Sequence, residues 1–327
     1  MSPRARPLDR VVAVAADRVS CRRYSLVGAA LMRVVLGSVA VLFYLANYTD
    51  RRMLFGPEGV WPWEPFTKSM ALESFSLYSL SASPYWFELL FHGGLALAVL
   101  FTVGWLPRWV LPAHYVFLWS LFERNPAILD GGDNLMVLVL VFLFFVDTGE
   151  HLALRGHVRS AGVLGWSLLS RRLGTVAHNA GILAIVLQVA TLYLASALYK
   201  IQGELWQSGT ALYYILRVNE YTLPGWSEHI YESAVLVTLL TYGTVLFQLA
   251  FPFLLLNRVT RYLAVLGAIA MHLGIAIIMG LVSFSLTVIA ADLVVVSDAR
   301  YLALLGKVKA YGKVRRRAVA ANPSRVS

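Results

Sequence analysis

The sequence is poor in charged residues and has almost no cysteine. Charged residues make up 14% of its 327 residues and hydrophobic residues 58%, whereas a soluble globular domain has about 25% and about 45–50%. This composition excludes an intrinsically disordered chain and argues against a soluble globular protein. Cys21 is the single cysteine, which excludes a disulfide within the chain.

The sequence contains long apolar runs with few charged residues. A helix needs about 20 residues to cross the hydrocarbon core of a bilayer. Two of the runs, Pro107–Phe122 and Ser283–Val296, are shorter than this and fit either a thin span or half of a re-entrant hairpin. The runs predict an all-α, polytopic membrane helix bundle of about eight transmembrane helices: Leu26–Tyr48, Tyr85–Leu106, Pro107–Phe122, Ala127–Val146, His178–Lys200, Ser233–Leu255, Tyr262–Gly280 and Ser283–Val296.

Acidic residues are outnumbered by basic ones, 18 against 28, and the distribution of the basic residues sets an orientation. Loops on the cytoplasmic side collect Lys and Arg. If all eight runs cross and the N-terminus is inside, 21 of the 28 basic residues are cytoplasmic. We therefore predict a multi-pass cell-membrane protein with both termini in the cytoplasm.

The same distribution divides the chain into three parts. Residues 1–25 are predicted to be a basic cytoplasmic N-terminus, residues 26–297 the transmembrane domain, and residues 298–327 a basic cytoplasmic tail. The basic residues lie between spans and at the ends instead of forming one patch. We therefore expect membrane lipids as a partner, and no nucleic acid.

Ionisable side chains inside apolar spans are costly and need an explanation. Several of them fall in the outer half of different spans, on one side of the membrane. The functional interpretation is an outward-facing ligand pocket with an aromatic wall, in which Lys200 is the candidate base. Its predicted lining is Glu88, His92, Asp133, His272, Tyr199 and Trp206.

Each of these residues also has a structural interpretation, and both stay open. Lys200 would extend to the interface and pair with Glu204. Asp133 would cap the next helix, and His272 would be a core histidine bonded to a neighbouring helix. Glu88 and His92, four residues apart, share one face of a helix. Without a third ligand, we predict no metal site there.

A second group of ionisable residues lies toward the cytoplasm. Arg33 is seven residues into the first span and Asp292 is near the inner end of the last. At about 1.5 Å per residue, both lie within roughly 10 Å of the inner interface. We predict a structural ion pair between Arg33 and Asp292, or failing that between Arg33 and Asp147.

Five stretches together resemble a known family. They are Arg33–Gly37, Leu54–Val60, Leu198–Ala211, Met271–Gly274 and Ser283–Leu286. In these stretches the chain resembles the HTTM family, the transmembrane domain shared with the vitamin K-dependent gamma-carboxylase. The resemblance runs from about Leu26 to Val296.

The resemblance implies a membrane domain that binds a reduced quinone and uses a lysine, here Lys200, as the base of a carboxylase-like lyase reaction. It also implies a secreted or membrane protein as substrate. The chain departs from the carboxylase: Asp133 stands where the carboxylase has a histidine, and only about 30 residues follow the last run. Whether the chain is an enzyme therefore stays open. The alternative is a non-enzymatic membrane protein: a subunit, a component of an antimicrobial system or a transporter of small lipophiles.

Overall fold

The computed structural model describes residues 20–70, 75–155 and 168–306. Every apolar run predicted from the sequence contains a helix. In chain order the elements are α2 (Leu26–Ala46), α3 (Arg51–Phe55), α4 (Trp63–Ser69), η1 (Leu77–Leu80), α5 (Pro84–Val103), α6 (Pro107–Arg124), η2 (Pro126–Ile128), α7 (Gly131–Leu143), α8 (Leu168–Ile201), α9 (Glu204–Gln207), α10 (Ala211–Ile215), η3 (Asn219–Tyr221), α11 (Ser227–Tyr231), α12 (Ala234–Leu254), α13 (Thr260–Ile278), α14 (Val282–Asp292) and η4 (Leu293–Val295).

In the described part of the chain, five helices are long and apolar enough to cross a membrane: α2, α5, α8, α12 and α13. A sixth span requires that Val282–Val295 and Asp298–Gly306, bent by 100° relative to each other, form one crossing. Two further runs give α6, which ends in Glu123 and Arg124, and α7, which has 13 residues. The all-α membrane bundle is confirmed, and the count of eight crossings stays a prediction.

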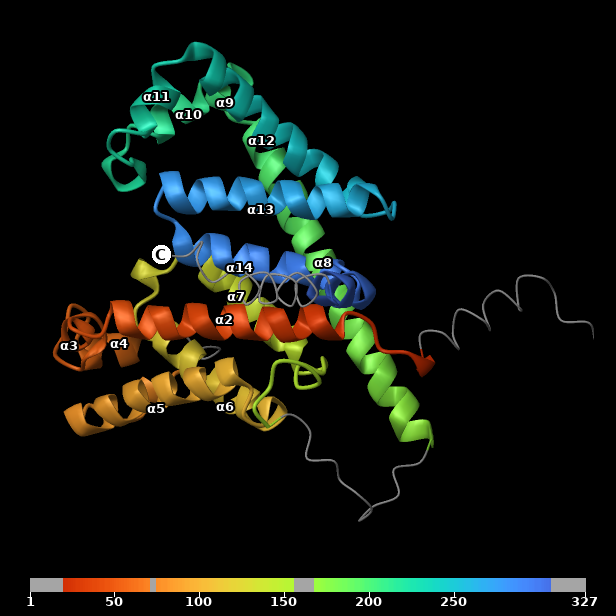
Figure 1. Cartoon of the computed structure of the whole chain (residues 1–327). Coiled ribbons are helices and arrows are strands. Elements are labelled where there is room, and N and C mark those ends of the chain that lie inside the picture. The colour runs from red at the N-terminus through yellow and green to blue at the C-terminus, as the bar shows by residue number, and fades with distance from the viewer. Residues whose placement is uncertain (1–19, 71–74, 156–167, 307–327) are drawn as a thin grey trace, which may run out of the picture.

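The helices form two packed groups that meet at α14. In one group α2 lies between α5 and α14, and α6 packs on α5 (Figure 1). In the other, α12 packs along α8, and α13 packs on both α12 and α14. The short helices α9, α10 and α11 lie together where α8 ends and α12 begins (Figure 1). Because α14 also contacts α7 and α8, it joins the two groups.

Proline and glycine set several of these boundaries. Pro84 and Pro107 occupy the first turns of α5 and α6, where a missing N–H costs no helical hydrogen bond. Gly104 ends α5 with a φ of 74°, in the left-handed region that favours glycine. Gly28 allows α2 to approach η4, because a Cβ there would lie 2.7 Å from the Leu293 carbonyl oxygen.

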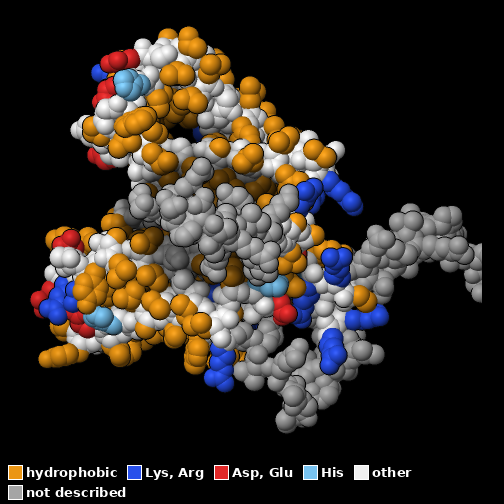
Figure 2. Space-filling view, in the orientation of Figure 1, with side chains coloured by type: hydrophobic (Ala, Val, Ile, Leu, Met, Phe, Trp, Pro, Cys, Tyr) orange, Lys and Arg blue, Asp and Glu red, His pale blue; other side chains and the backbone are white. Residues whose placement is uncertain are grey.

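Charge is distributed unevenly between the two ends of the bundle. Lys and Arg side chains gather toward the right of Figure 2, the end at which α2 begins and α12 ends. This is the end that the sequence assigns to the cytoplasm, and the observed pattern fits the positive-inside rule. The two termini themselves, residues 1–19 and 307–327, lie outside the described residues.

The start of α2 is held by side chains from distant parts of the chain. Ser25 occupies the N-cap position without making a side-chain cap. Instead, the backbone N–H groups of Leu26 and Val27 donate to the Asp298 carboxylate at 3.2 and 2.8 Å. Just upstream, the Tyr24 N–H donates to the Asn179 side chain on α8. The first span is therefore capped by the last part of the described chain.

Candidate functional site

Lys200 lies in the last turn of α8, at the end of the helix where the aromatic segment α9–α11 follows. Its Nζ donates to Ser196 Oγ at 2.6 Å and to Gln248 Oε1 on α12 at 3.0 Å. The ammonium also lies 5.1 Å from the centre of the Trp206 ring. Glu204 is exposed, and no ion pair joins it to Lys200 among the described residues. Lys200 is thus held by neutral acceptors and not by a carboxylate.

Tyr193 lies two helical turns before Lys200 on α8 and organises the buried part of the site. Its hydroxyl donates to Asp292 Oδ2 on α14 at 3.0 Å. Its ring packs on Phe251, with centroids 4.0 Å apart, and lies 6.0 Å from the His272 ring on α13. The side chains of Tyr193, His272 and Asp292 are at most 3% exposed.

These residues form one polar group between four helices. Lys200 is joined to Gln248 by a hydrogen bond, and the His272 ring contacts Tyr193, which lies two turns from Lys200 on the same helix. We call Tyr193, Lys200, Gln248, His272 and Asp292 the Lys200 cluster. Helices α8, α12, α13 and α14 each contribute to it, and apolar side chains surround it.

The cluster is incompletely satisfied. Two of its buried polar atoms, His272 Nδ1 and Asp292 Oδ1, have no hydrogen-bond partner among the described residues. A buried polar atom without a partner costs about 1–3 kcal/mol, and such atoms are rare enough that each requires an explanation. Lys200 also has a third N–H beyond the two that bond Ser196 and Gln248. The arrangement can therefore bind further polar atoms.

Arg33 and Asp292 do not form the predicted ion pair. Arg33 is fully buried and donates only to main-chain carbonyls. Its Nη1 bonds Phe101 and Thr102 at 2.7 and 2.6 Å, and its Nε and Nη2 bond Thr148 and Leu152 at 3.2 and 2.5 Å. The last carbonyls of a helix have no partner within the helix and carry partial negative charge. The C-terminus of α5 and the carbonyls of Thr148 and Leu152, after α7, therefore satisfy the guanidinium in place of an acid.

The two acids expected to pair with Arg33 have other partners. Asp292 accepts from Tyr193, and Asp147 pairs with Arg23 at 2.5 Å. Matching depth in the membrane was thus insufficient to predict a contact. Both predicted pairings of Arg33 are wrong, because the acids face α8 and the chain before α2.

Glu88 and His92 belong to a different cluster. The Glu88 carboxylate pairs with Arg51 and Arg52 at 3.0 and 2.6 Å, and His92 Nε2 lies 3.1 Å from the Tyr48 hydroxyl. These partners come from the end of α2 and from α3. In the described residues, no three His, Cys, Asp or Glu side chains are placed to hold a metal ion. The pairing with two arginines gives Glu88 a structural role.

Two other residues of the predicted lining, Asp133 and Tyr199, also lie outside the Lys200 cluster. Asp133 closes a capping box with Asp130: its carboxylate accepts from the Asp130 N–H at 2.9 Å, and Asp130 caps α7 in return. Tyr199 is 78% exposed and therefore does not belong to the buried cluster. Of the predicted lining, the structure therefore brings Trp206 to Lys200, and it places His272 against Tyr193 on the same helix as Lys200.

Sequence reasoning missed Gln248 and Tyr193. Gln248 is a lone amide inside an apolar run. Like a charged residue in a span, such an amide is costly in the membrane and could have been predicted as a site residue. Tyr193 precedes Lys200 by seven residues, which places both on one face of the helix. Neither signal identifies a partner without the packing of α8 against α12 and α14.

Comparison with known proteins gives two relatives. No family model and no solved structure matches the chain. The uncharacterized protein YitO of Bacillus subtilis (strain 168) is 27% identical over 216 residues, which cover 64% of this chain and 68% of YitO. The sporulation-delaying protein SdpB of the same organism is 25% identical over 274 residues, covering 80% of this chain and 78% of SdpB. The chain is therefore an all-α membrane protein with a modest sequence relationship to YitO and SdpB.

Proposed function

We propose that this chain is a multi-pass cell-membrane protein of the HTTM type, and that the Lys200 cluster is its binding site for the polar head of an amphipathic ligand. One observation carries the proposal. A half-buried ammonium, held by the neutral acceptors Ser196 and Gln248, retains a third N–H, and α13, which packs on α12, carries a buried His272 ring whose Nδ1 has no partner among the described residues.

The residues present suit a reduced quinone, the ligand that the HTTM resemblance implies. The third N–H of Lys200 can donate to a ring oxygen, and the Trp206 indole offers an aromatic surface beside it. When bound, a reduced quinone would supply the reducing electrons for chemistry with oxygen. The contribution of the chain would be to orient the head group between Lys200 and His272 and to shield it from water.

Mass spectrometry of quinones extracted from the full chain, purified in mild detergent, tests this proposal. We expect wild-type protein to carry a quinone and Lys200→Met to lose it. Lys68→Met is the matched control, because Lys68 is exposed and pairs with Glu64 on α4. Folded wild-type protein without any quinone, or equal amounts in wild type and Lys200→Met, would overturn the quinone assignment.

A second candidate is a non-enzymatic component of an antimicrobial system. The similarity to the sporulation-delaying protein SdpB, over 80% of this chain, favours it. In this case the Lys200 cluster would hold a lipid or peptide ligand without chemistry. A gene for a small secreted peptide beside the gene for this chain would favour this candidate, and purified protein free of quinone would strengthen it.

A further inference from the structure

An exposed patch of aromatic, aliphatic and basic side chains lies at the end of the bundle that the sequence assigns to the cytoplasm. Two segments form it, the turn between α5 and α6 and the chain that follows α7. The Leu154 and Arg155 N–H groups donate to carbonyls at the end of α5 at 3.0 and 3.2 Å. In return, the Leu106 N–H donates to the Arg155 carbonyl at 2.8 Å. We call Trp105, Arg108, Trp109, Leu152, Leu154 and Arg155 the inner patch.

The apolar side chains of the inner patch are largely exposed. Trp109 is 76% exposed and Leu154 is 79% exposed, and the values for Leu152 and Trp105 are 58% and 41%. Contiguous apolar surface of this kind is costly in water and marks an interaction surface. Tryptophan in particular is enriched where a membrane meets water, because its ring is amphipathic. The composition of the patch therefore indicates contact with lipid at the level of the headgroups.

The depth of the inner patch follows from Arg33. This residue is seven positions into α2, roughly 10 Å from the start of that span. Its guanidinium bonds the carbonyls of Thr102 and Leu152. Because His92 near the start of α5 contacts Tyr48 beyond the end of α2, the two helices are antiparallel, and the turn after Thr102 lies further toward the cytoplasm. The patch thus lies between the level of Arg33 and the inner surface of the membrane.

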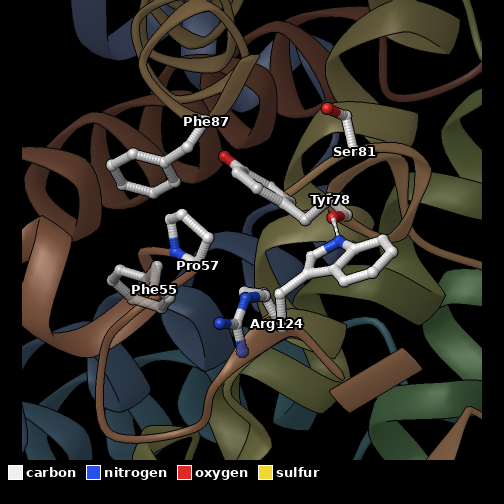
Figure 3. Close-up of a pocket in the computed structure, with 7 residues that line it drawn as sticks. Phe55, Pro57, Tyr78, Ser81, Phe87 and Arg124 are labelled. Carbon is white, nitrogen blue, oxygen red and sulfur yellow. Dashed lines mark hydrogen bonds between the residues drawn. The ribbon is translucent and has the colours of Figure 1, made fainter. Parts of the chain in front are cut away.

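The two arginines of the inner patch differ from the buried arginines of the bundle. Buried Arg124 (Figure 3) donates through its Nη2 to the main-chain carbonyls of Gly56 and Trp61 at 2.7 and 2.5 Å. By contrast, Arg108 and Arg155 are exposed, and their guanidinium groups have no hydrogen bond or ion pair within the described part of the chain. Their N–H groups are therefore available to a partner outside the protein.

Acidic residues beside the inner patch do not neutralise it. Asp147 precedes the patch on the same segment and pairs with Arg23 at 2.5 Å. Glu150 is exposed and joins no ion pair among the residues that the structure describes. Two arginines against one exposed carboxylate leave the patch positive. Positive charge at this depth attracts anionic lipids, and a guanidinium group matches the geometry of phosphate oxygens.

The backbone of the inner patch is held in place by the rest of the fold. Leu106 and Leu152 have φ angles of 47° and 51°, in the left-handed region that residues other than glycine rarely adopt. The Leu106 N–H bonds the Arg155 carbonyl, and the Leu152 carbonyl accepts from Arg33 Nη2 at 2.5 Å. Such conformations persist only where the surrounding structure holds them. The patch is therefore a preformed surface.

We propose that the inner patch is a docking site for anionic phospholipid of the inner leaflet. Its two arginines bond the lipid phosphate groups, while its indoles and leucines lie at the level of the glycerol backbone and the upper acyl chains. Exposure, depth and unbalanced charge each support this occupant. The patch shares no residue with the Lys200 cluster, so the proposal is independent of the function proposed above.

Thermal unfolding of the full chain in mild detergent tests the proposal. The protein is titrated with phosphatidylglycerol or with phosphatidylcholine of the same acyl chains. Because a ligand that binds only the folded state stabilises it, we expect Tm to rise more with phosphatidylglycerol. The double variant Arg108→Gln/Arg155→Gln should respond equally to the two lipids. Equal rises of Tm for the two lipids in wild-type protein would overturn the proposal.

Arg258→Gln separates a docking site from general positive charge. Arg258 is exposed and lies between α12 and α13, at the same end of the bundle. Its replacement removes the same charge as Arg155→Gln does. We expect Arg258→Gln to keep the wild-type preference for phosphatidylglycerol and Arg155→Gln to weaken it. Equal loss in the two variants would attribute the preference to overall charge and contradict the assignment.

Quenching by brominated lipid checks the position of Trp109. The protein is placed in vesicles of equal phosphatidylglycerol and phosphatidylcholine, with the acyl chains of one or the other brominated. The quenching that Trp109→Phe removes is expected to be larger when phosphatidylglycerol carries the bromine. Trp226→Phe is the control, because Trp226 is 67% exposed in the segment before α12 and should show no such difference.

Absence of quenching at Trp109 with either lipid would place the inner patch in water, facing a soluble protein, and would overturn the proposal. Neither measurement involves quinone, so failure of this proposal is recognised separately from failure of the quinone assignment.

Discussion

Arg33 and the Lys200 cluster show two ways of burying charge in one helix bundle. All three nitrogens of Arg33 donate to main-chain carbonyls, and Nη1 bonds two carbonyls at the end of α5. Lys200 is instead held by the side chains of Ser196 and Gln248, and buried atoms nearby lack partners. Backbone acceptors hold a charge in one place, whereas side-chain acceptors can exchange for a ligand. We infer that Arg33 stabilises the fold and that Lys200 serves a site.

The largest effect is expected from Arg33→Met. This change removes the guanidinium bonds to the carbonyls of Phe101, Thr102, Thr148 and Leu152. The Phe101 carbonyl keeps the Gly104 N–H as a partner, and each buried carbonyl left without a donor costs about 1–3 kcal/mol. We expect little folded protein by fluorescence-detected size exclusion. Arg258→Met, an exposed arginine near the same end of the bundle, is the control. Wild-type yield and Tm for Arg33→Met would show that the carbonyls find other donors and that the comparison is mistaken.

Gly28→Ala is expected to have the next largest effect. The new Cβ would lie 2.7 Å from the Leu293 carbonyl oxygen and 3.0 Å from Val294 Cα, and both obstacles are backbone. Overpacking of this kind costs about 1–3 kcal/mol, measured as a lower free energy of unfolding. Gly243→Ala in α12 has open space around it and should be neutral. Equal effects of the two changes would show that α2 and η4 separate easily.

Tyr193→Phe tests how much the Lys200 cluster contributes to stability compared with Arg33. It removes the hydroxyl that donates to Asp292 but keeps the ring on Phe251. Losing a partner of a buried acid should lower the free energy of unfolding by about 1–2 kcal/mol. Tyr199→Phe is the matched control, because Tyr199 is 78% exposed on the same helix. A loss as large as that of Arg33→Met would make the cluster structural.

Lys200→Arg should have the smallest effect on stability. It keeps the positive charge and the hydrogen-bond donors, so we expect the free energy of unfolding to change by less than about 1 kcal/mol. Arginine cannot supply a neutral amine. If Lys200 is a base, the variant should lose function while it stays folded. Full function with Lys200→Arg, measured as the phenotype that Lys200→Met removes, would exclude a base role.

The sequence predicts the elements of this fold better than their contacts. Apolar runs bounded by Pro84, Gly104 and Pro107 appear as helices with nearly the predicted ends. The pairing of Arg33 with Asp292 failed because depth in a bilayer does not determine the direction in which a residue faces around the bundle. No sequence pattern identifies the carbonyls of Phe101 and Thr102 as partners, since they depend on how α5 ends beside α2.

The candidate site, too, could be predicted only in part from the sequence. The placement of Lys200 and His272 in the outer halves of their spans predicts that they line one pocket; in the structure Lys200 bonds Gln248 and His272 contacts Tyr193. Glu88 met the same criterion, but Arg51 and Arg52 neutralise it from α3. The burial of Arg124, which lies between two predicted spans, has no sequence signal, because the segment that carries Gly56 and Trp61 folds over it.

The capping of α2 by Asp298 has a consequence for biosynthesis. Asp298, which accepts from the Leu26 and Val27 N–H groups, lies 272 and 271 positions after them. During translation, the first span therefore enters the membrane with an open end, which closes only after nearly the whole chain has been synthesised. We expect ribosome-stalled chains that stop before Asp298 to remain accessible to quality-control proteases. Lengthening the chain past this residue should confer protease resistance in a single step.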